Sequence, residues 1–193
     1  MKNNLQIVSN LLELQTRNIE DEKARNLAQE GQSRVQSMAL IHQKLYQNED
    51  LSIQFEDYLE KLVGEIGKMY GEGKVQTEIE GGGYQFDIDT AIPLGLIVNE
   101  LVTNAFKYAF QENSENHLRI SLSQQDPDFH QLTISDNGPG LPTDLDIAKT
   151  RSLGLRLVRR LAKQLHGKVS YSHNEGSTFT LLFKDSSKRL LVD

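Results

Sequence analysis

Apolar residues in the first 50 positions recur three and four apart, which is the spacing of one face of a helix. Leu5, Val8 and Leu12 form one such series. Alternating spacings of four and three then give a heptad seam: Ala24, Ala28, Gly31, Val35, Met38, His42 and Leu45. Because only a short connection near residues 16–21 separates the two series, the pattern predicts an antiparallel helical hairpin over residues 1–50. Two such helices bury little alone, so we expect a second hairpin to complete a four-helix bundle.

The remaining sequence mixes helical and strand periodicity. Ser52 precedes an amphipathic run and is predicted to cap that helix. Longer helices are predicted over about Thr90–Phe110 and Ser152–His166. Alternating runs predict strands at residues 74–80, 118–123, 131–135, 168–172 and 177–183, the last two antiparallel. The order predicts an α+β fold, in which the hairpin of residues 1–50 precedes a two-layer α/β sandwich over residues 51–193.

Composition narrows the classes of function. The net charge is −6 and the acidic residues are scattered, which argues against a nucleic-acid partner, because such a partner needs clustered Lys and Arg. The chain has no cysteine, which excludes disulfides and thiolate metal sites and fits a reducing cytosol. No stretch approaches the roughly 18 consecutive apolar residues of a membrane-spanning helix. We therefore expect a cytoplasmic location, with no membrane segment in this chain.

The helix predicted over residues 90–110 carries a stripe of polar side chains. At ~100° per residue, Glu100, Asn104 and Lys107 fall on one face, opposite Leu94 and Val98. Such a stripe is usually only a solvated surface. Beside a phosphate ligand, however, Asn104 could offer Mg²⁺ a neutral oxygen and Lys107 could neutralise phosphate. Glu100 could then accept a proton from an attacking group.

Three glycine-containing segments follow this helix. Asp-Asn-Gly-Pro-Gly at residues 136–140 ends a predicted strand, and an ionised Asp there accepts hydrogen bonds, as the amino group of adenine requires. Ser-Leu-Gly-Leu at residues 152–155 opens a helix, whose free N–H groups can bind phosphate. Glu-Gly-Ser-Thr-Phe at residues 175–179 leads into the last strand. Each segment alone also fits an ordinary turn, helix start or hairpin.

Taken in order, Asn-Glu-Leu-Val-Thr-Asn-Ala-Phe-Lys-Tyr-Ala (99–109) and the three glycine segments resemble the nucleotide-binding boxes of the GHKL superfamily. That superfamily includes gyrase, a heat-shock chaperone, histidine kinases and MutL, and the resemblance covers residues 52–184. It implies a Bergerat-type fold that binds ATP with Mg²⁺, the metal on Asn104, and a short lid at residues 141–153. Glu100 is the candidate catalytic base. The residues expected around ATP are Asn104, Lys107, Tyr108, Asp136, Gly138, Gly140, Ser152, Leu153, Gly154, Leu155 and Thr178.

The helical hairpin points to one branch of that superfamily. Lys-Asn-Asn-Leu-Gln at residues 2–6 and His-Gln-Lys-Leu-Tyr at residues 42–46 resemble the histidine kinases related to the HWE subclass, whose acceptor box reads His-Arg-Val-Lys-Asn-Asn-Leu-Gln. The resemblance implies the core of a sensor histidine kinase in a two-component system. Such a core passes the γ-phosphoryl of ATP to a histidine, and then to an aspartate in the receiver domain of a response regulator. It also implies a homodimer formed through the hairpin.

The acceptor histidine of that box would lie three residues before Lys2, and this chain begins at Met1. Either the sequence begins inside the box or the protein starts there, and the abrupt opening of the first helix favours the former. We therefore do not expect these 193 residues to phosphorylate themselves at the usual position. The other histidines lack the acidic neighbour expected of an acceptor, and their spacing predicts no metal site: His42, His117, His130, His166 and His173.

Two other hypotheses stay open. The chain could be a non-catalytic dimerisation and docking module that binds nucleotide as a structural or regulatory ligand, which the missing acceptor favours. It could also be an anti-sigma-type serine kinase, or a hydrolase on the same fold. The Lys-Asn-Asn-Leu-Gln segment argues against this last class.

Overall fold

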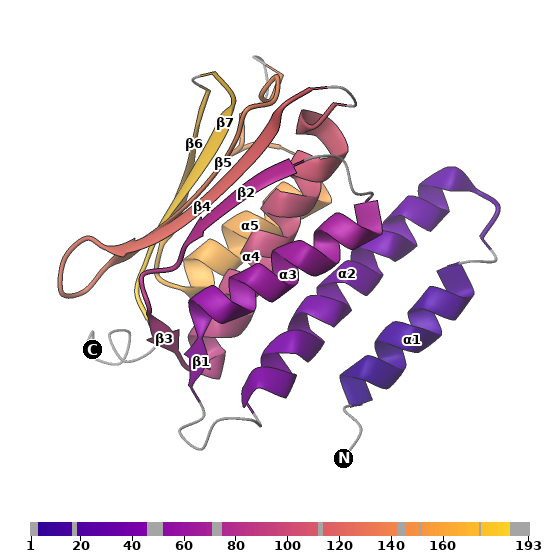
Figure 1. Ribbon diagram of the computed structural model, residues 1–193, viewed down its shortest axis with the longest axis horizontal. Coiled ribbons are helices and arrows are strands. Elements are labelled where there is room, and N and C mark those ends of the chain that lie inside the picture. The colour runs from indigo at the N-terminus through magenta and orange to yellow at the C-terminus, as the bar shows by residue number, and fades with distance from the viewer. Residues whose placement is uncertain are drawn as a thin grey trace.

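The computed structural model describes residues 4–16, 19–45, 52–70, 75–111, 114–142, 146–150, 152–173 and 175–185. Its helices are α1 (Asn4–Thr16), α2 (Glu22–Leu45), α3 (Phe55–Tyr70), α4 (Ile88–Asn104), η1 (Ala105–Ala109) and α5 (Leu153–Gln164). Its strands are β1 (Ile53–Gln54), β2 (Val75–Glu80), β3 (Gln85–Phe86), β4 (Asn116–Gln124), β5 (His130–Asp136), β6 (Lys168–His173) and β7 (Ser177–Phe183). The predicted α+β fold, a helical N-terminal region followed by helices packed on a sheet, is confirmed (Figure 1).

The main sheet has five strands in the order β2-β4-β5-β7-β6. Only the β2–β4 pair is parallel, and β6 and β7 pair antiparallel as predicted. Alternate residues of β5 and β7 are buried, because one face of the sheet packs on α3, α4 and α5 (Figure 1). Ile134 of β5 stands between Ile120 of β4 and Phe179 of β7, and this face forms the core.

Helix α4 lies in the middle of the molecule, between the sheet and α2 (Figure 1). Most of its residues are buried, the polar Asn99 and Glu100 among them, because α4 packs on α2, α3 and α5 as well as on the sheet. Asp87 caps its first turn by accepting a hydrogen bond from the backbone N–H of Thr90 at 3.1 Å. The side chains of Leu94, Ile97 and Val98 are fully buried. At roughly 1.5–3 kcal/mol for each buried Leu or Ile, this helix is a main source of stability.

The helix predicted over residues 90–110 changes type before its end. The α-helix stops at Asn104, and η1 continues as a π-helical turn, in which the N–H of Phe110 bonds to the carbonyl of Ala105, five residues earlier, at 3.2 Å. A π turn changes the direction of the side chains that follow it. Lys107 therefore reaches α2, while Tyr108 is 72% exposed.

The predicted hairpin is present as α1 and α2, but α2 also packs on the second half of the chain. The side chains of Ser33, Ser37 and Ile41, one turn apart, are buried against α3 and α4. The heptad seam is only partly covered at Val35 and Met38. The boundary at residue 50 between a hairpin domain and an ATP-binding domain stays a prediction.

The start of α3 differs from the prediction. Ser52 was expected to cap this helix, but the short strand β1 lies between them. The hydroxyl of Ser52 donates to the side-chain carbonyl of Gln85 at 3.1 Å instead, and the N–H of Phe55 donates to the carbonyl of Tyr84 at 3.0 Å. The prediction was wrong because two-residue strands such as β1 and β3 are too short to show a period.

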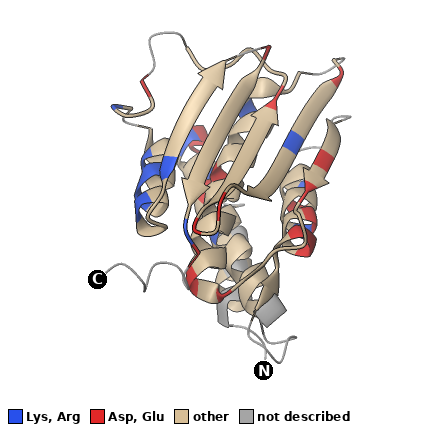
Figure 2. Cartoon of the chain, turned by 90° about the vertical axis from the view of Figure 1, so that its left-hand side faces the viewer, with Lys and Arg blue, Asp and Glu red and all other residues tan. Residues whose placement is uncertain are grey.

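Charge is distributed unevenly over the fold, as Figure 2 shows. Helix α5 carries four basic residues and no acidic one, whereas acidic residues gather at α3 and β2, toward the other edge of the sheet. The positive side of the molecule is therefore the one on which α5 lies. No helix in the described part of the chain is long and apolar enough to cross a membrane.

Candidate nucleotide-binding site

A cavity of about 580 Å³ lies where α4, the end of β5, the start of α5 and the start of β7 meet. This volume is within the range of small-molecule sites. Segments far apart in the sequence form its wall. The predicted site residues in that wall are Glu100, Asn104, Tyr108, Asp136, Gly140, Ser152, Leu153, Gly154 and Leu155.

Asp136 is the last residue of β5, and hydrogen bonds from the backbone hold its side chain. One carboxylate oxygen accepts from the N–H of Gly138 at 2.9 Å and from the N–H of Ser177 at 3.4 Å. Burial raises the pKa of Asp136, and these two hydrogen bonds offset part of that effect. The result is an acceptor fixed in the cavity wall, as recognition of an amino group requires.

The loop after Asp136 is shaped by its two glycines. Gly140 has a φ of +80°, a backbone conformation that residues with a Cβ rarely adopt. Its neighbour Leu141 donates its N–H to the hydroxyl of Tyr171 at 2.8 Å, which ties the loop to β6. Gly138 does not line the cavity; it packs so closely against Ala109 of η1 that a Cβ would collide there.

The last strand places Ser177, rather than Thr178, at the cavity. Ser177 and Phe179 are buried and line the wall, whereas Thr178 lies between them and faces the other side of the sheet. Thr178 was predicted at the adenine end, and the structure puts its side chain elsewhere because successive residues of a strand face opposite sides. The sequence signal that could have identified Ser177 is the apolar Phe179 two residues later, because alternate residues of a strand share a face.

Helix α5 begins at the cavity, with residues 152–155 in the wall. Ser152 holds the N-cap position, but its side chain makes no capping hydrogen bond. The first turn of a helix has free N–H groups and the positive end of the dipole, which suit phosphate. A Cβ on Gly154 would lie 2.7 Å from a carboxylate oxygen of Glu100, so this glycine lets Glu100 approach α5. Of the predicted lid, residues 143–145 and 151 lie outside the described residues.

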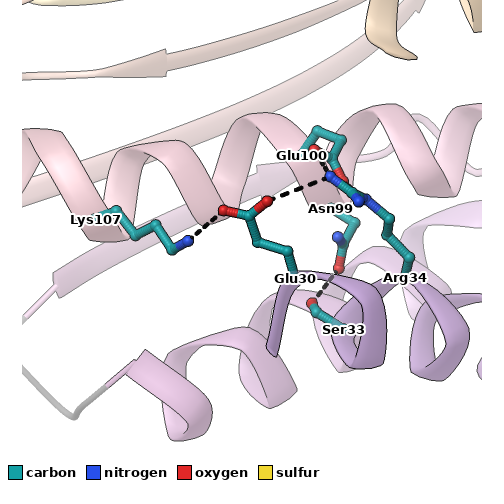
Figure 3. A network of polar contacts seen from close by, with 6 residues as sticks. All are labelled: Glu30, Ser33, Arg34, Asn99, Glu100 and Lys107. Carbon is teal, nitrogen blue, oxygen red and sulfur yellow. Dashed lines mark hydrogen bonds and ion pairs between the residues drawn. The ribbon is translucent and has the colours of Figure 1, made fainter. Parts of the chain in front are cut away.

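Glu100 and Lys107 are both engaged by α2, as Figure 3 shows. The guanidinium of Arg34 donates to both oxygens of Glu100, at 2.5 and 2.8 Å. Lys107 donates to Glu30 at 2.7 Å, and Glu30 lies 3.6 Å from Arg34. Beside them, the hydroxyl of Ser33 donates to the side-chain oxygen of Asn99 at 2.7 Å. The sequence did not predict this network, because Glu30 and Arg34 have the spacing of an ordinary surface pair on one helix.

The network keeps its basic members charged. The hydrogen bond to Glu100 raises the pKa of Arg34, against the effect of burial. For Lys107, burial lowers the pKa, but the bond to Glu30 and the nearby Tyr70 more than offset it, so the net direction is upward. Lys107 is not in the cavity wall; its ammonium is occupied by Glu30, which is in the wall.

The cavity wall fits a magnesium-bound nucleotide in one particular way. The described residues contain no group of three or more acidic or histidine side chains that could hold a metal by themselves. Mg²⁺ commonly takes one or two protein oxygens together with phosphate oxygens and water. Asn104 supplies a neutral oxygen in the wall, so the residues present suit an ion that arrives with phosphates.

Two protein families match this chain. Residues 89–187, which contain the cavity wall of α4, β5, α5 and β7, match the histidine kinase-, DNA gyrase B- and HSP90-like ATPases. The chain belongs to this family of ATPases. Residues 1–70, which contain α1, α2 and α3, match a family described as histidine kinase.

Individual relatives agree with this assignment. The chain is 32% identical over 165 residues to the sensor histidine kinase PdtaS of Mycolicibacterium smegmatis, and 26% identical over 169 residues to blue-light-activated histidine kinase 2 of Erythrobacter litoralis. Each match covers 83% of this chain, which spans only 32% and 48% of those relatives. The solved histidine kinase domain of a blue-light-activated kinase from Erythrobacter litoralis has the same fold, with a TM-score of 0.77 at 21% identity over 97% of this chain and 100% of that one.

Proposed function

We propose that this chain is the kinase core of a two-component system, which transfers the γ-phosphoryl group of ATP to a histidine. A response-regulator receiver domain then takes the group onto an aspartate. The observation that carries the proposal is the convergence of four separate segments on one cavity: residues 100–108, 136–140, 152–155 and 177. Membership of the ATPase family and the histidine kinase match over residues 1–70 support it. A cytoplasmic location is part of the proposal.

In this proposal one end of the cavity binds adenine and the other end binds the phosphates. Asp136 accepts a hydrogen bond from the amino group of adenine, and Ser177 takes the neighbouring place that Thr178 was expected to fill. The first turn of α5 at Gly154 faces the phosphates. Asn104 holds Mg²⁺, which when bound neutralises phosphate charge. Tyr108, largely exposed on η1, flanks the phosphates from outside.

Glu100 is the group we assign to proton transfer. It is 6% exposed and lies in the cavity wall beside Gly154. In the transfer, an imidazole nitrogen of the acceptor histidine forms a bond to the γ-phosphorus, the bond from that phosphorus to the bridging oxygen breaks, and ADP leaves. Glu100 takes the imidazole proton. Most of the rate enhancement then comes from positioning and charge neutralisation.

The outer face of the hairpin supports a homodimer. Four apolar side chains stand out on it, with exposed fractions of 47% for Ile7, 54% for Leu11, 60% for Leu14 and 60% for Leu27. The first three share one face of α1, at spacings of four and three. A second copy that packs its own hairpin here would bury this face and form a four-helix bundle.

The proposed activity is tested by restoring the acceptor box. A chain in which His-Arg-Val directly precedes Lys2 should become labelled by γ-labelled ATP, and the label should be acid-labile. Glu100→Gln in that chain should lower the labelling rate by about 100-fold or more, with ATP still bound. No label in a restored chain that binds ATP would contradict the kinase assignment, and acid-stable label on a partner serine would favour the serine-kinase hypothesis.

A further inference from the structure

Side chains of α2 bind the two charged groups that the proposed reaction needs. Glu100 is held in a two-fold hydrogen bond by Arg34, and Lys107 is held by Glu30 (Figure 3). All four side chains are largely buried, with exposed fractions of 7% for Glu100, 16% for Lys107, 18% for Arg34 and 27% for Glu30. Ion pairs with so little water around them are stronger than surface pairs. In this arrangement Glu100 is not available to take a proton.

Glu30 also bears directly on nucleotide binding, since its side chain is part of the cavity wall. A triphosphate would bring several negative charges to the phosphate end of the cavity. The ammonium of Lys107 there is already paired with Glu30. Two anions that compete for one largely buried cation cannot both bind at full strength. Adenosine brings no such charge and would not meet this competition.

The two halves of α2 are attached to different parts of the protein. Ser33 and Arg34 contact α4 at the cavity, and Glu30 contacts Lys107 of η1. One turn later, Ser37 shares a hydrogen bond with the hydroxyl of Tyr58 on α3 at 3.1 Å, and Gln36 donates to Glu65 on α3 at 3.1 Å. The contacts of Gln36 and Ser37 with α3 do not involve Lys107, so they do not depend on the ion pair between Lys107 and Glu30.

We propose that Glu30 and Arg34 form an autoinhibitory latch, in which docked α2 and the phosphates of a bound nucleotide compete for Lys107. The inference rests on the proposed function of the cavity. When the latch is closed, Arg34 holds Glu100 and Glu30 weakens phosphate binding. When phosphates bind Lys107, α2 loses its ion pair to η1. By thermodynamic linkage, the free energy by which α2 docking weakens ATP binding equals the free energy by which ATP binding weakens α2 docking.

The first experiment measures how tightly the 193-residue chain binds ATP with Mg²⁺, and adenosine, by titration calorimetry. Glu30→Gln should lower the Kd for ATP by about fivefold or more and leave the Kd for adenosine unchanged. Glu65→Gln is the matched control, because it removes the same charge from a contact of α2 with α3 outside the cavity wall. It should change neither Kd.

A double-mutant cycle then separates competition from plain repulsion. In a Lys107→Ala background, the effect of Glu30→Gln on the Kd for ATP should be clearly smaller. An effect of undiminished size would mean that Glu30 only repels the phosphates, and would overturn the latch. A Kd for ATP that rises in Asp136→Asn but does not change in Glu30→Gln would overturn the latch and leave the proposed function in place. Absence of ATP binding in the wild type and in every variant would overturn the proposed function, and the latch with it.

The reciprocal effect is measured on α2 itself. Since the chain has no cysteine, Ser33→Cys introduces a single thiol at a position that is 3% exposed and faces Asn99. Saturating ATP with Mg²⁺ should raise the alkylation rate of this thiol by about fivefold or more, and adenosine should not. Ser37→Cys, one turn later against Tyr58, is the control and should stay protected. An alkylation rate at position 33 that ATP leaves unchanged would overturn the proposal.

Discussion

Two of the carboxylates in the cavity wall, Asp136 and Glu100, are stabilised in opposite ways. Asp136 accepts hydrogen bonds from the backbone of Gly138 and Ser177, and burial raises its pKa. Glu100 has a guanidinium bonded to both of its oxygens. The ionised form of Asp136 therefore costs stability that a ligand can recover, whereas the charge of Glu100 is balanced within the protein.

The first prediction concerns Asp136→Asn. The unliganded variant should unfold at the same temperature as the wild type or higher at neutral pH, because an amide has no charge to bury and its oxygen can still accept from Gly138 and Ser177. ATP with Mg²⁺ should raise the Tm of the wild type and not that of the variant. An equal ATP-dependent rise in both proteins would contradict the role of Asp136.

The same substitution makes a pH-dependent prediction. The pKa of Asp136 is higher in the folded protein than in the unfolded chain. The cost of its charge is therefore fully present above the folded pKa, and is lost as the pH falls through that pKa toward the unfolded value. The Tm difference between variant and wild type should be greatest at neutral pH and shrink in the acid range. Thermal unfolding at a series of pH values measures it, and a difference that grows on acidification would contradict this account.

At the scale of elements, the site is built from the ends of helices and strands. Helix α4 changes into η1 directly after Asn104, β5 ends at Asp136, and α5 begins at Leu153. The ends of helices and strands carry free backbone groups, so they can bind a ligand without weakening the middle of the helix or strand. Close approach between these ends depends on residues without a side chain, of which Gly154 beside Glu100 is one.

Gly154→Ala tests that approach. The new Cβ would lie 2.7 Å from Glu100, whose carboxylate Arg34 holds in place, so Glu100 or the start of α5 must shift. We expect weaker ATP binding, by about tenfold, with a small change in the Tm of the unliganded protein. Gly64→Ala, on an exposed face of α3 with no atom near the new Cβ, is the control. It should stabilise the protein by about 0.5–1 kcal/mol and leave the Kd for ATP unchanged. Equal ATP affinity in both variants would contradict the close approach.

At the scale of the whole molecule, the hairpin has one face on the ATP-binding half and another that is uncovered. The inner face of α2 is polar where it meets the cavity, at Ser33 and Arg34. The outer face of α1 is apolar, at Ile7, Leu11 and Leu14. A polar contact can exchange one partner for another, such as a phosphate, whereas an apolar face in water favours permanent burial. The proposed dimer and the proposed latch thus use opposite faces of one hairpin.

Leu11→Lys tests the dimer. A charge in the middle of the apolar face of α1 should convert a dimer into a monomer in sedimentation analysis. It should leave the unfolding of the monomer nearly unchanged, because Leu11 is already 54% exposed. Leu182→Lys, at a 37% exposed position on β7, is the control and should keep the mass of the wild type. A wild-type chain that stays monomeric at high concentration, or a Leu11→Lys chain that stays dimeric, would contradict this arrangement.

Much of the fold was readable from local pattern. The two helices of the hairpin, the five strands of the main sheet and α5 each repeat a period within one continuous segment, which a single sequence records directly. Most residues of the cavity wall were also predictable, because the order of the aspartate and glycine segments along the chain is typical of the nucleotide-binding boxes described above. Thr178 was misplaced by a single position, and strand alternation around Phe179 held the information needed.

The sequence by itself determined most of the elements and the class of fold, since these depend on neighbours along the chain. The resemblance of its glycine segments to a known family pointed to most of the residues that meet in the cavity wall. Only the tertiary structure decided which partners the charged side chains take. Arg34 and Glu100 are 66 residues apart, and Glu30 and Lys107 are 77 apart. Such pairs depend on how α2 docks on α4 and on the π turn that redirects Lys107. No local pattern encodes that docking, because it arises from the packing of the whole core.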